Sequence, residues 1–229
     1  MTPFSPLSGT ISERISQIRQ SLPDSVRLIA VTKQVSIAAM REAYDAGLRD
    51  FGESRIQEAE IKQAQFKDFP DITWHLIGHL QSNKAQKALE HFQWIHSIDS
   101  LKLAQRLNTL AESLHQKPQV LLQVKILPDP NKYGWEVADL AQDLSELDQC
   151  RSLDIKGLMT ILPLGLSDSQ SLDVFRQTRE LATKIQQQGW SHLRMGQLSM
   201  GMSNDYELAV QAGATLVRLG RILFGDRGT

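Results

Sequence analysis

The sequence predicts an α/β fold, a (β/α)8 barrel of the TIM type preceded by one N-terminal helix. Short apolar segments alternate with longer amphipathic ones along the whole chain, and eight of the short segments have the character of buried strands. The length of 229 residues is close to that of α/β barrels that form one domain. An open doubly wound sheet is the alternative. We expect one domain over residues 1–229, with a loose N-terminus at residues 1–10.

The first half of the chain contains the leading helix and four units of a strand followed by a helix. Apolar residues recur at helical spacing from Ile11 to Leu22, and Pro23 ends this helix. The four strands are expected at residues 26–31, 49–51, 73–77 and 94–96. The helices after them are expected from the cap Ser36 to Gly47, at 53–66, at 83–90, and from the cap Ser100 to Leu114.

The second half continues the same alternation. Strands are expected at residues 120–125, 155–159, 197–199 and 215–218, and helices at 137–147, 171–188 and 205–211. Strands that alternate with helices at this spacing are parallel and are joined by right-handed crossovers. Eight such units in a chain of this length favour the closed barrel over the open sheet.

Composition narrows the class of partner. The 25 basic and 26 acidic side chains nearly balance, so neither nucleic acid nor an anionic membrane is an expected partner. The single cysteine, Cys150, has no companions at metal-ligand spacing and fits a reducing compartment. Residues 1–9 lack the features of a signal peptide, and no segment is long and apolar enough to span a bilayer. We therefore expect a cytoplasmic protein.

In a parallel barrel the loops after the strands share one face, and that face carries the site. Lys33, Ser54 and His79 follow the first three expected strands. A lysine at the end of a buried strand is usually a solvated residue, so Lys33 needs further support. Glu53 and Glu58 are expected on a solvated helix face, and the histidines have no carboxylate partners that would form a metal site.

The loops after the seventh and eighth strands supply that support. The segment from Ser199 through Met200 and Gly201 to Ser203 precedes a helix, and its small residues can bring backbone N–H groups close to an anion. The last strand ends at Gly220 and Arg221, where a glycine leaves the backbone open to close approach. Many barrels bind a phosphate at these two loops. A tight turn with a helix cap is the alternative interpretation.

A phosphate there would lie next to Lys33, because barrel closure puts the last strand beside the first. A phosphate beside an amine suggests a ligand that also carries an aldehyde, either pyridoxal 5′-phosphate or a phosphorylated sugar in a class I aldolase. Arg218 is expected to point from the last strand toward the cavity. Because arginine only donates hydrogen bonds, it would keep a facing pyridine nitrogen unprotonated and weaken the cofactor as an electron sink.

These motifs together resemble the pyridoxal phosphate homeostasis protein family, the YggS-like or PROSC-like proteins, which is related to the N-terminal barrel of alanine racemase. The resemblance extends from about Val26 to Gly225. The segments that carry it are Ala30-Val31-Thr32-Lys33, Phe51-Gly52-Glu53 with Gln57-Glu58, Trp74-His75-Leu76-Ile77-Gly78-His79-Leu80-Gln81-Ser82-Asn83-Lys84, Gly157-Leu158-Met159, residues 198–205 (LSMGMSND) and residues 217–225 (VRLGRILFG).

The resemblance implies roles for individual residues. Lys33 matches the lysine that forms the Schiff base with pyridoxal 5′-phosphate, and Arg218 matches the arginine that faces the pyridine nitrogen. Other positions match the phosphate anchors or the surroundings of the cofactor, namely Ser203 and the backbones of Gly220 and Arg221 for the phosphate, and Ser199, Met200, Gly201 and His79 for the surroundings. The family usually has asparagine where this chain has Ser54, and the shorter serine has less reach toward the cofactor.

The resemblance also implies a function in pyridoxal phosphate homeostasis, and in amino-acid and keto-acid balance, without catalytic turnover. Alanine racemase carries a second domain that completes its active site, whereas this chain is expected to end just after the barrel closes. We expect a monomer whose partners are the cofactor and apo-enzymes that depend on it. The alternatives are a small pyridoxal-dependent amino-acid racemase, a class I aldolase, and an interaction module that uses the barrel as a scaffold.

Overall fold

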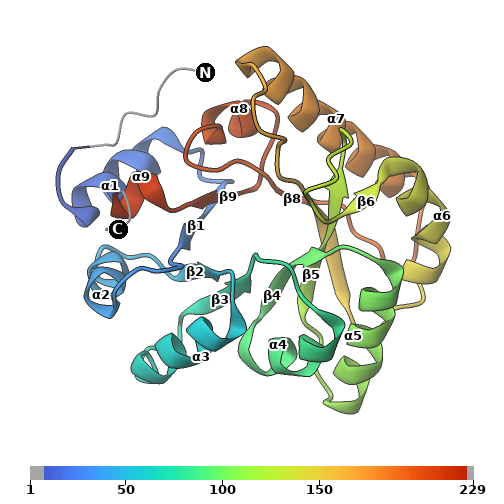
Figure 1. The fold of residues 1–229 in the computed structure, drawn as a ribbon, viewed down its shortest axis with the longest axis horizontal. Helices are drawn as coiled ribbons and strands as arrows, with labels where there is room; N and C mark the ends of the chain where they lie inside the picture. The colour runs from blue at the N-terminus through green and yellow to red at the C-terminus, as the bar shows by residue number, and fades with distance from the viewer. Residues whose placement is uncertain (1–7, 226–229) are drawn as a thin grey trace.

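Eight parallel strands form a closed barrel with helices around it (Figure 1). The computed structural model describes residues 8–225. Each strand pairs with its neighbours in the ring, and β1 pairs with β9 to close it. The barrel strands are β1 (Arg27–Val31), β2 (Asp50–Glu53), β3 (Thr73–Leu76), β4 (Trp94–Ile98), β5 (Gln119–Lys125), β7 (Asp154–Met159), β8 (Gln197–Ser199) and β9 (Leu216–Leu219).

Helices follow the strands and cover the outside of the barrel (Figure 1). Hydroxyl side chains of Thr10, Ser36, Ser100 and Ser167 cap four of them. No helix within residues 8–225 is long and apolar enough to cross a membrane. The helices are α1 (Ile11–Ser21), α2 (Ile37–Asp45), α3 (Ile56–Gln65), α4 (Ala85–His91), α5 (Leu101–Ser113), α6 (Val137–Leu147), α7 (Asp168–Gln187), α8 (Tyr206–Gln211) and α9 (Arg221–Phe224), with a 3-10 turn, η1 (Ser82–Lys84).

The predicted barrel is confirmed, and several boundaries differ from the prediction. The helix expected at 171–188 begins earlier, because Ser167 and Gln170 form a capping box ahead of its first apolar residue. A two-residue strand, β6 (Trp135–Glu136), pairs with β5 outside the ring, and it was not predicted. The expected loose N-terminus lies outside the described residues up to position 7, and Thr10 is ordered as the cap of α1.

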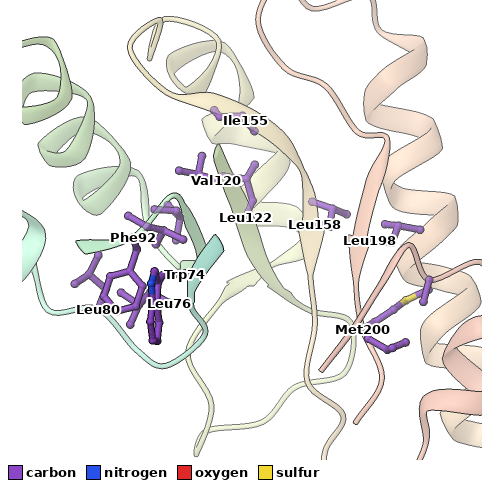
Figure 2. Close-up of a cluster of buried hydrophobic side chains, with 14 of the residues drawn as sticks. Trp74, Leu76, Leu80, Phe92, Val120, Leu122, Ile155, Leu158, Leu198 and Met200 are labelled. Carbon is purple, nitrogen blue, oxygen red and sulfur yellow. The ribbon is translucent and has the colours of Figure 1, made fainter. Parts of the chain in front are cut away.

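The hydrophobic core has two parts. The larger part lies between the strands and the helices, and Figure 2 shows side chains of β5, β7 and β8 within it. The smaller part fills the barrel interior with five fully or almost fully buried residues, Ile29, Trp94, Leu121, Met159 and Leu216. Each large apolar side chain buried in this way contributes about 1.5–3 kcal/mol. Ile29 belongs to the interior part, whereas Leu28 and Ala30 on either side of it belong to the larger part, so successive residues of β1 alternate between the interior and the helix layer.

The pairing of β1 with β9 fixes what lies beside the end of β1. Ile29 pairs with Arg218, and Ala30 pairs with Leu219. Paired residues on parallel strands point to the same side of the sheet, so Arg218 shares the barrel interior with Ile29. The loop after β9 therefore begins beside the end of β1, which leads directly into Lys33.

We expect Gly157→Ala to destabilise the barrel by about 1–3 kcal/mol or more, because the alanine would overpack the contact between β7 and β8. A Cβ at position 157 would lie 1.8 Å from the carbonyl oxygen of Gln197. Urea denaturation measures the free energy of unfolding. Gly196→Ala is the matched control, since nothing lies within 4 Å of its Cβ, and an equal effect of the two substitutions would contradict this account.

Candidate functional site

Lys33 lies at the mouth of the barrel, directly after β1. The Thr32 N–H donates to the Gly52 carbonyl at 3.0 Å and continues the pairing of β1 with β2 by one residue. Alternation from Ile29 and Val31 then directs Lys33 toward the interior side, and the residue is half-buried. The sequence predicted a lysine at the end of a strand, and the structure has one there.

The turn that follows Lys33 is held on both sides. The Val35 N–H donates to the Thr32 carbonyl at 2.9 Å, and Gln34 has a left-handed backbone with φ of 60°. The Gln34 N–H donates to Glu58 Oε1 at 2.5 Å. The carbonyl of Thr32 accepts from Lys62 Nζ, also at 2.5 Å. The backbone on either side of Lys33 is thus bonded to side chains of α3.

A buried ionic cluster lies behind this turn, between β2 and α3. Lys62 Nζ lies 2.8 Å from Glu53 Oε1 and 2.6 Å from Glu58 Oε1. The Thr32 hydroxyl donates to the same oxygen of Glu53 at 2.6 Å. Burial raises the pKa of the Glu53 carboxyl, and the hydrogen bonds from Lys62 and Thr32 only partly offset this effect. Within the described residues, Glu53 Oε2 has no hydrogen-bond partner.

The expectation that Glu53 lies on a solvated helix face was wrong. Glu53 is the last residue of β2 and is completely buried, and α3 begins three residues later at Ile56. Pairing with Leu76 of β3 keeps position 53 in the sheet and directs it toward the helix layer. Glu58 is half-buried and bonded to Lys62, so it is not a freely solvated carboxylate either.

We expect Lys62→Met to lower the free energy of unfolding by about 3–5 kcal/mol near neutral pH, because it leaves the Glu53 carboxylate buried without a cation. The raised pKa of Glu53 means that stability is lost as the pH rises above the ordinary carboxyl value and through the folded-state pKa. Urea denaturation at about pH 5 and about pH 7.5 should therefore show a larger loss at the higher pH.

The double variant Lys62→Met, Glu53→Gln is the control for this prediction. It removes the buried charge together with its partner, so it should recover most of the lost stability and lose the pH dependence. A double variant that unfolds as readily as Lys62→Met would show that packing, not the stranded carboxylate, causes the loss.

Arg218 is buried in the barrel interior, with 4% of its surface exposed. One guanidinium nitrogen donates to Ser199 Oγ at 2.7 Å, and the other donates to the Thr160 carbonyl at 2.9 Å. Burial lowers the pKa of Arg218 to about 10, against the opposing effect of the Asp205 carboxylate. The guanidinium is therefore charged at neutral pH and fixed by two acceptors.

The loops after β8 and β9 meet at the same mouth. Ser203 Oγ accepts from the Ile222 N–H at 3.4 Å, and Arg221 donates to Asn204 Oδ1 at 2.9 Å. Gly201 has a φ of +94°, and a Cβ there would lie 2.7 Å from the Cβ of Ala209. Gly220 follows β9, where a Cβ would lie 3.3 Å from the Val31 carbonyl. The two segments singled out in the sequence are thus in contact.

Met200 differs from its neighbours in this loop. Its side chain is fully buried in the core between the strands and the helices (Figure 2). Its N–H donates to the Leu216 carbonyl at 3.1 Å. Met200 can therefore face the mouth only through its backbone.

His79 and Ser54 lie in loops on the other side of the mouth. His79 Nδ1 is 2.9 Å from Asp99 Oδ2, and its ring stacks on Tyr133 with 3.5 Å between the ring centroids. The backbone of Ser54 packs closely against Gly78, because a Cβ on Gly78 would lie 2.2 Å from the Ser54 carbonyl oxygen. Sequence reasoning did not pair His79 with either Asp99 or Tyr133.

Sequence reasoning also missed two polar groups that support the site. Lys62 was not singled out, although a lysine nine residues after Glu53 is within reach once position 53 is in a strand. His96 Nδ1 lies 2.8 Å from Ser199 Oγ, so this histidine contacts a residue that also binds Arg218. For His96, the available signal was a polar residue inside a short apolar strand. Among residues 8–225 no cluster of His, Cys, Asp and Glu could hold a metal ion.

The sequence matches the family model described as alanine racemase, N-terminal domain, over residues 8–228. It is 54% identical to the pyridoxal phosphate homeostasis protein of Synechocystis sp. over 212 residues, which cover 93% of this chain and 96% of that protein. The pyridoxal phosphate homeostasis protein of Pseudomonas aeruginosa is 41% identical, with 96% of each chain covered.

Solved structures agree with these matches. PipY of Synechococcus elongatus with PLP bound has a TM-score of 0.91 and 53% identity, and the match covers 94% of this chain and all of that one. Alanine racemase of Clostridium difficile has a TM-score of 0.76 at 15% identity and shares the fold. That match covers 96% of this chain and 57% of the racemase.

Proposed function

Because the chain belongs to the pyridoxal phosphate homeostasis protein family, within the wider family of the alanine racemase N-terminal domain, we propose that it binds pyridoxal 5′-phosphate covalently through Lys33. Its function is to hold this cofactor for pyridoxal phosphate homeostasis, and so for amino-acid and keto-acid balance, without turnover of an amino acid. The observation that carries the proposal is the position of Lys33 at the barrel mouth, beside the loops after β8 and β9.

The residues at the mouth fit the chemical groups of this cofactor. An amine that reacts with an aldehyde is supplied by Lys33. The phosphate requires several hydrogen-bond donors in a small space, and the segments at Ser203 and at Gly220 to Arg221 offer a hydroxyl and backbone groups. Gly201 and Gly220 lie where a side chain would crowd Ala209 and Val31. Ser199, Met200, Gly201, His79 and Ser54 complete the proposed surroundings, Met200 through its backbone.

Arg218 explains why holding is favoured over turnover. When bound, pyridoxal phosphate supplies an electron sink for carbanion chemistry, and the strength of that sink depends on protonation of its ring nitrogen. A charged guanidinium donates only, so Arg218 facing that nitrogen would keep it unprotonated. Ser199 and the Thr160 carbonyl fix the guanidinium in the barrel interior. This arrangement supports tight retention of the cofactor and weak carbanion stabilisation.

The proposal includes recipients and context. Apo-enzymes that depend on pyridoxal phosphate are the proposed partners, and the barrel acts as a single-domain monomer in the cytoplasm. Tyr133 is 56% exposed beside His79, and Met202 is 37% exposed in the loop after β8. These exposed side chains at the mouth support release of the cofactor to another protein at this face. Cys150 is buried and unpaired, in keeping with a reducing compartment.

Purified protein with pyridoxal phosphate should show a visible absorption band near about 420 nm that borohydride removes, because the cofactor forms an imine with a lysine. Lys33→Ala should lose the band and still unfold at the wild-type temperature, since a half-buried lysine after a strand contributes little packing. Lys102→Ala, an exposed lysine on α5, is the matched control. A Lys33→Ala protein that keeps the band would overturn the assignment.

An activity assay separates holding from turnover. Steady conversion of L-alanine or L-serine to the D-enantiomer, abolished by Lys33→Ala, would overturn the non-catalytic half of the proposal in favour of a small racemase. Formation of the band without any added sugar phosphate would exclude the class I aldolase.

A further inference from the structure

Five side chains form one continuous line of hydrogen bonds across the barrel interior. Arg218 donates to Ser199 Oγ at 2.7 Å, and Ser199 Oγ lies 2.8 Å from His96 Nδ1. His96 Nε2 lies 3.0 Å from His75 Nδ1, and His75 Nε2 lies 2.9 Å from Asp50 Oδ1. Every separation is within the normal range for a hydrogen bond.

The line runs from one side of the barrel to the other. Arg218 and Ser199 belong to β9 and β8, whereas His96, His75 and Asp50 belong to β4, β3 and β2. Ser199, His75 and His96 have no exposed surface. The Asp50 side chain is 20% exposed at the start of β2, where Arg27 lies 3.6 Å away. His75 also stacks on Trp94, one of the apolar residues that fill the interior.

The chemistry of the two ends fixes the direction of each hydrogen bond. Arginine only donates, and an ionised carboxylate only accepts. If the Ser199 hydroxyl donates to His96 Nδ1, neutral His96 carries its proton on Nε2 and donates to His75. His75 then also carries its proton on Nε2 and donates to Asp50. This direction satisfies every group with both imidazoles neutral.

The opposite direction leaves groups unsatisfied. If His96 Nδ1 carried the proton and donated to Ser199, its Nε2 would have to accept from His75 Nδ1. His75 would then need a second proton on Nε2 to reach the Asp50 carboxylate, and it would be a buried cation. Burial instead lowers the pKa of His75, and lowers that of His96 well below its ordinary value, which favours two neutral rings.

We propose that Asp50, His75 and His96 are positioning residues that act through Ser199 to hold the Arg218 guanidinium in the barrel interior. Because His96 Nδ1 accepts a hydrogen bond from the Ser199 hydroxyl, the lone pairs of Ser199 Oγ are directed at Arg218. Asp50 fixes the tautomer of His75, which in turn fixes that of His96. The expected effect on cofactor binding rests on the proposed function, since it requires that Arg218 face the pyridine nitrogen.

The first test uses the cofactor-free protein, so it does not depend on the proposed function. Nitrogen-15 NMR of the imidazole rings should show both His75 and His96 as neutral rings protonated on Nε2 at neutral pH. The guanidinium signals of Arg218 should show slow rotation in the wild type and faster rotation in His96→Leu. An Nδ1-protonated or doubly protonated ring, or unchanged Arg218 signals in the variant, would overturn the proposal.

The second test measures binding of pyridoxal phosphate. His96→Leu should raise the dissociation constant about tenfold or more and change the visible band, because the Ser199 hydroxyl that accepts from Arg218 is no longer held in one orientation. His96→Asn keeps an acceptor near the position of Nδ1 and should restore part of the affinity. His91→Leu makes the same change on α4, outside the barrel, and should bind as the wild type does.

The two tests separate the possible failures. If wild-type protein binds no pyridoxal phosphate, the proposed function fails. The NMR measurement alone then decides whether the line of hydrogen bonds positions Arg218. If His96→Leu is folded and binds the cofactor with wild-type affinity and spectrum, the positioning role is wrong. Should His96→Leu not fold, Asp50→Leu replaces it at the exposed end of the line, with Asp50→Asn as the variant that keeps an acceptor.

Discussion

The pairing of β1 with β9 is the contact on which the rest of the site depends. It turns a twisted sheet into a closed barrel and sets Ile29 beside Arg218. In an open sheet the first and last strands could lie at opposite edges, and Lys33 would have no relation to the loop at Gly220. Closure brings Lys33 and Gly220, which are 187 positions apart in the sequence, to the same mouth of the barrel. A lysine at a strand end becomes informative only through this contact.

The polar line across the barrel carries a cost in stability that an apolar interior would not have. Part of the barrel interior is filled by apolar side chains such as Leu121 and Met159. Another part is filled by polar side chains, namely Arg218, Ser199, His96 and His75. Replacing buried ionic groups by well-packed apolar ones is often neutral or stabilising, so stability alone does not account for them. Their hydrogen bonds are nevertheless complete, which is the condition for tolerating polar groups at this depth. Under the proposal above, these polar residues are kept because their hydrogen bonds hold the Arg218 guanidinium in place.

The local pattern of apolar, capping and turn residues predicted the strands, most helices and the loops that carry Lys33, Ser203 and Gly220, because each of these depends on residues close in sequence. It failed where tertiary contact decides. Glu53 became a buried strand residue because β3 extends the pairing of β2, and no local signal separates that from a helix start. Met200 lies among loop residues but packs in the core, since alternation after Ser199 directs it to the helix layer. The pairing of His75 with His96 requires knowing which strands are adjacent.

The two buried networks act on opposite faces of the same strand end. On the helix side, Lys62 and Glu58 bond the backbone before and after Lys33, and Thr32 bonds Glu53. On the interior side, the hydrogen-bond line ends at Arg218, whose strand pairs with β1. The backbone on either side of Lys33 is thereby fixed. A fixed backbone at this position favours binding of a ligand, because less conformational freedom is lost on binding. Under the proposed function, release of the cofactor would involve the loops of the mouth, where Tyr133 and Met202 are exposed.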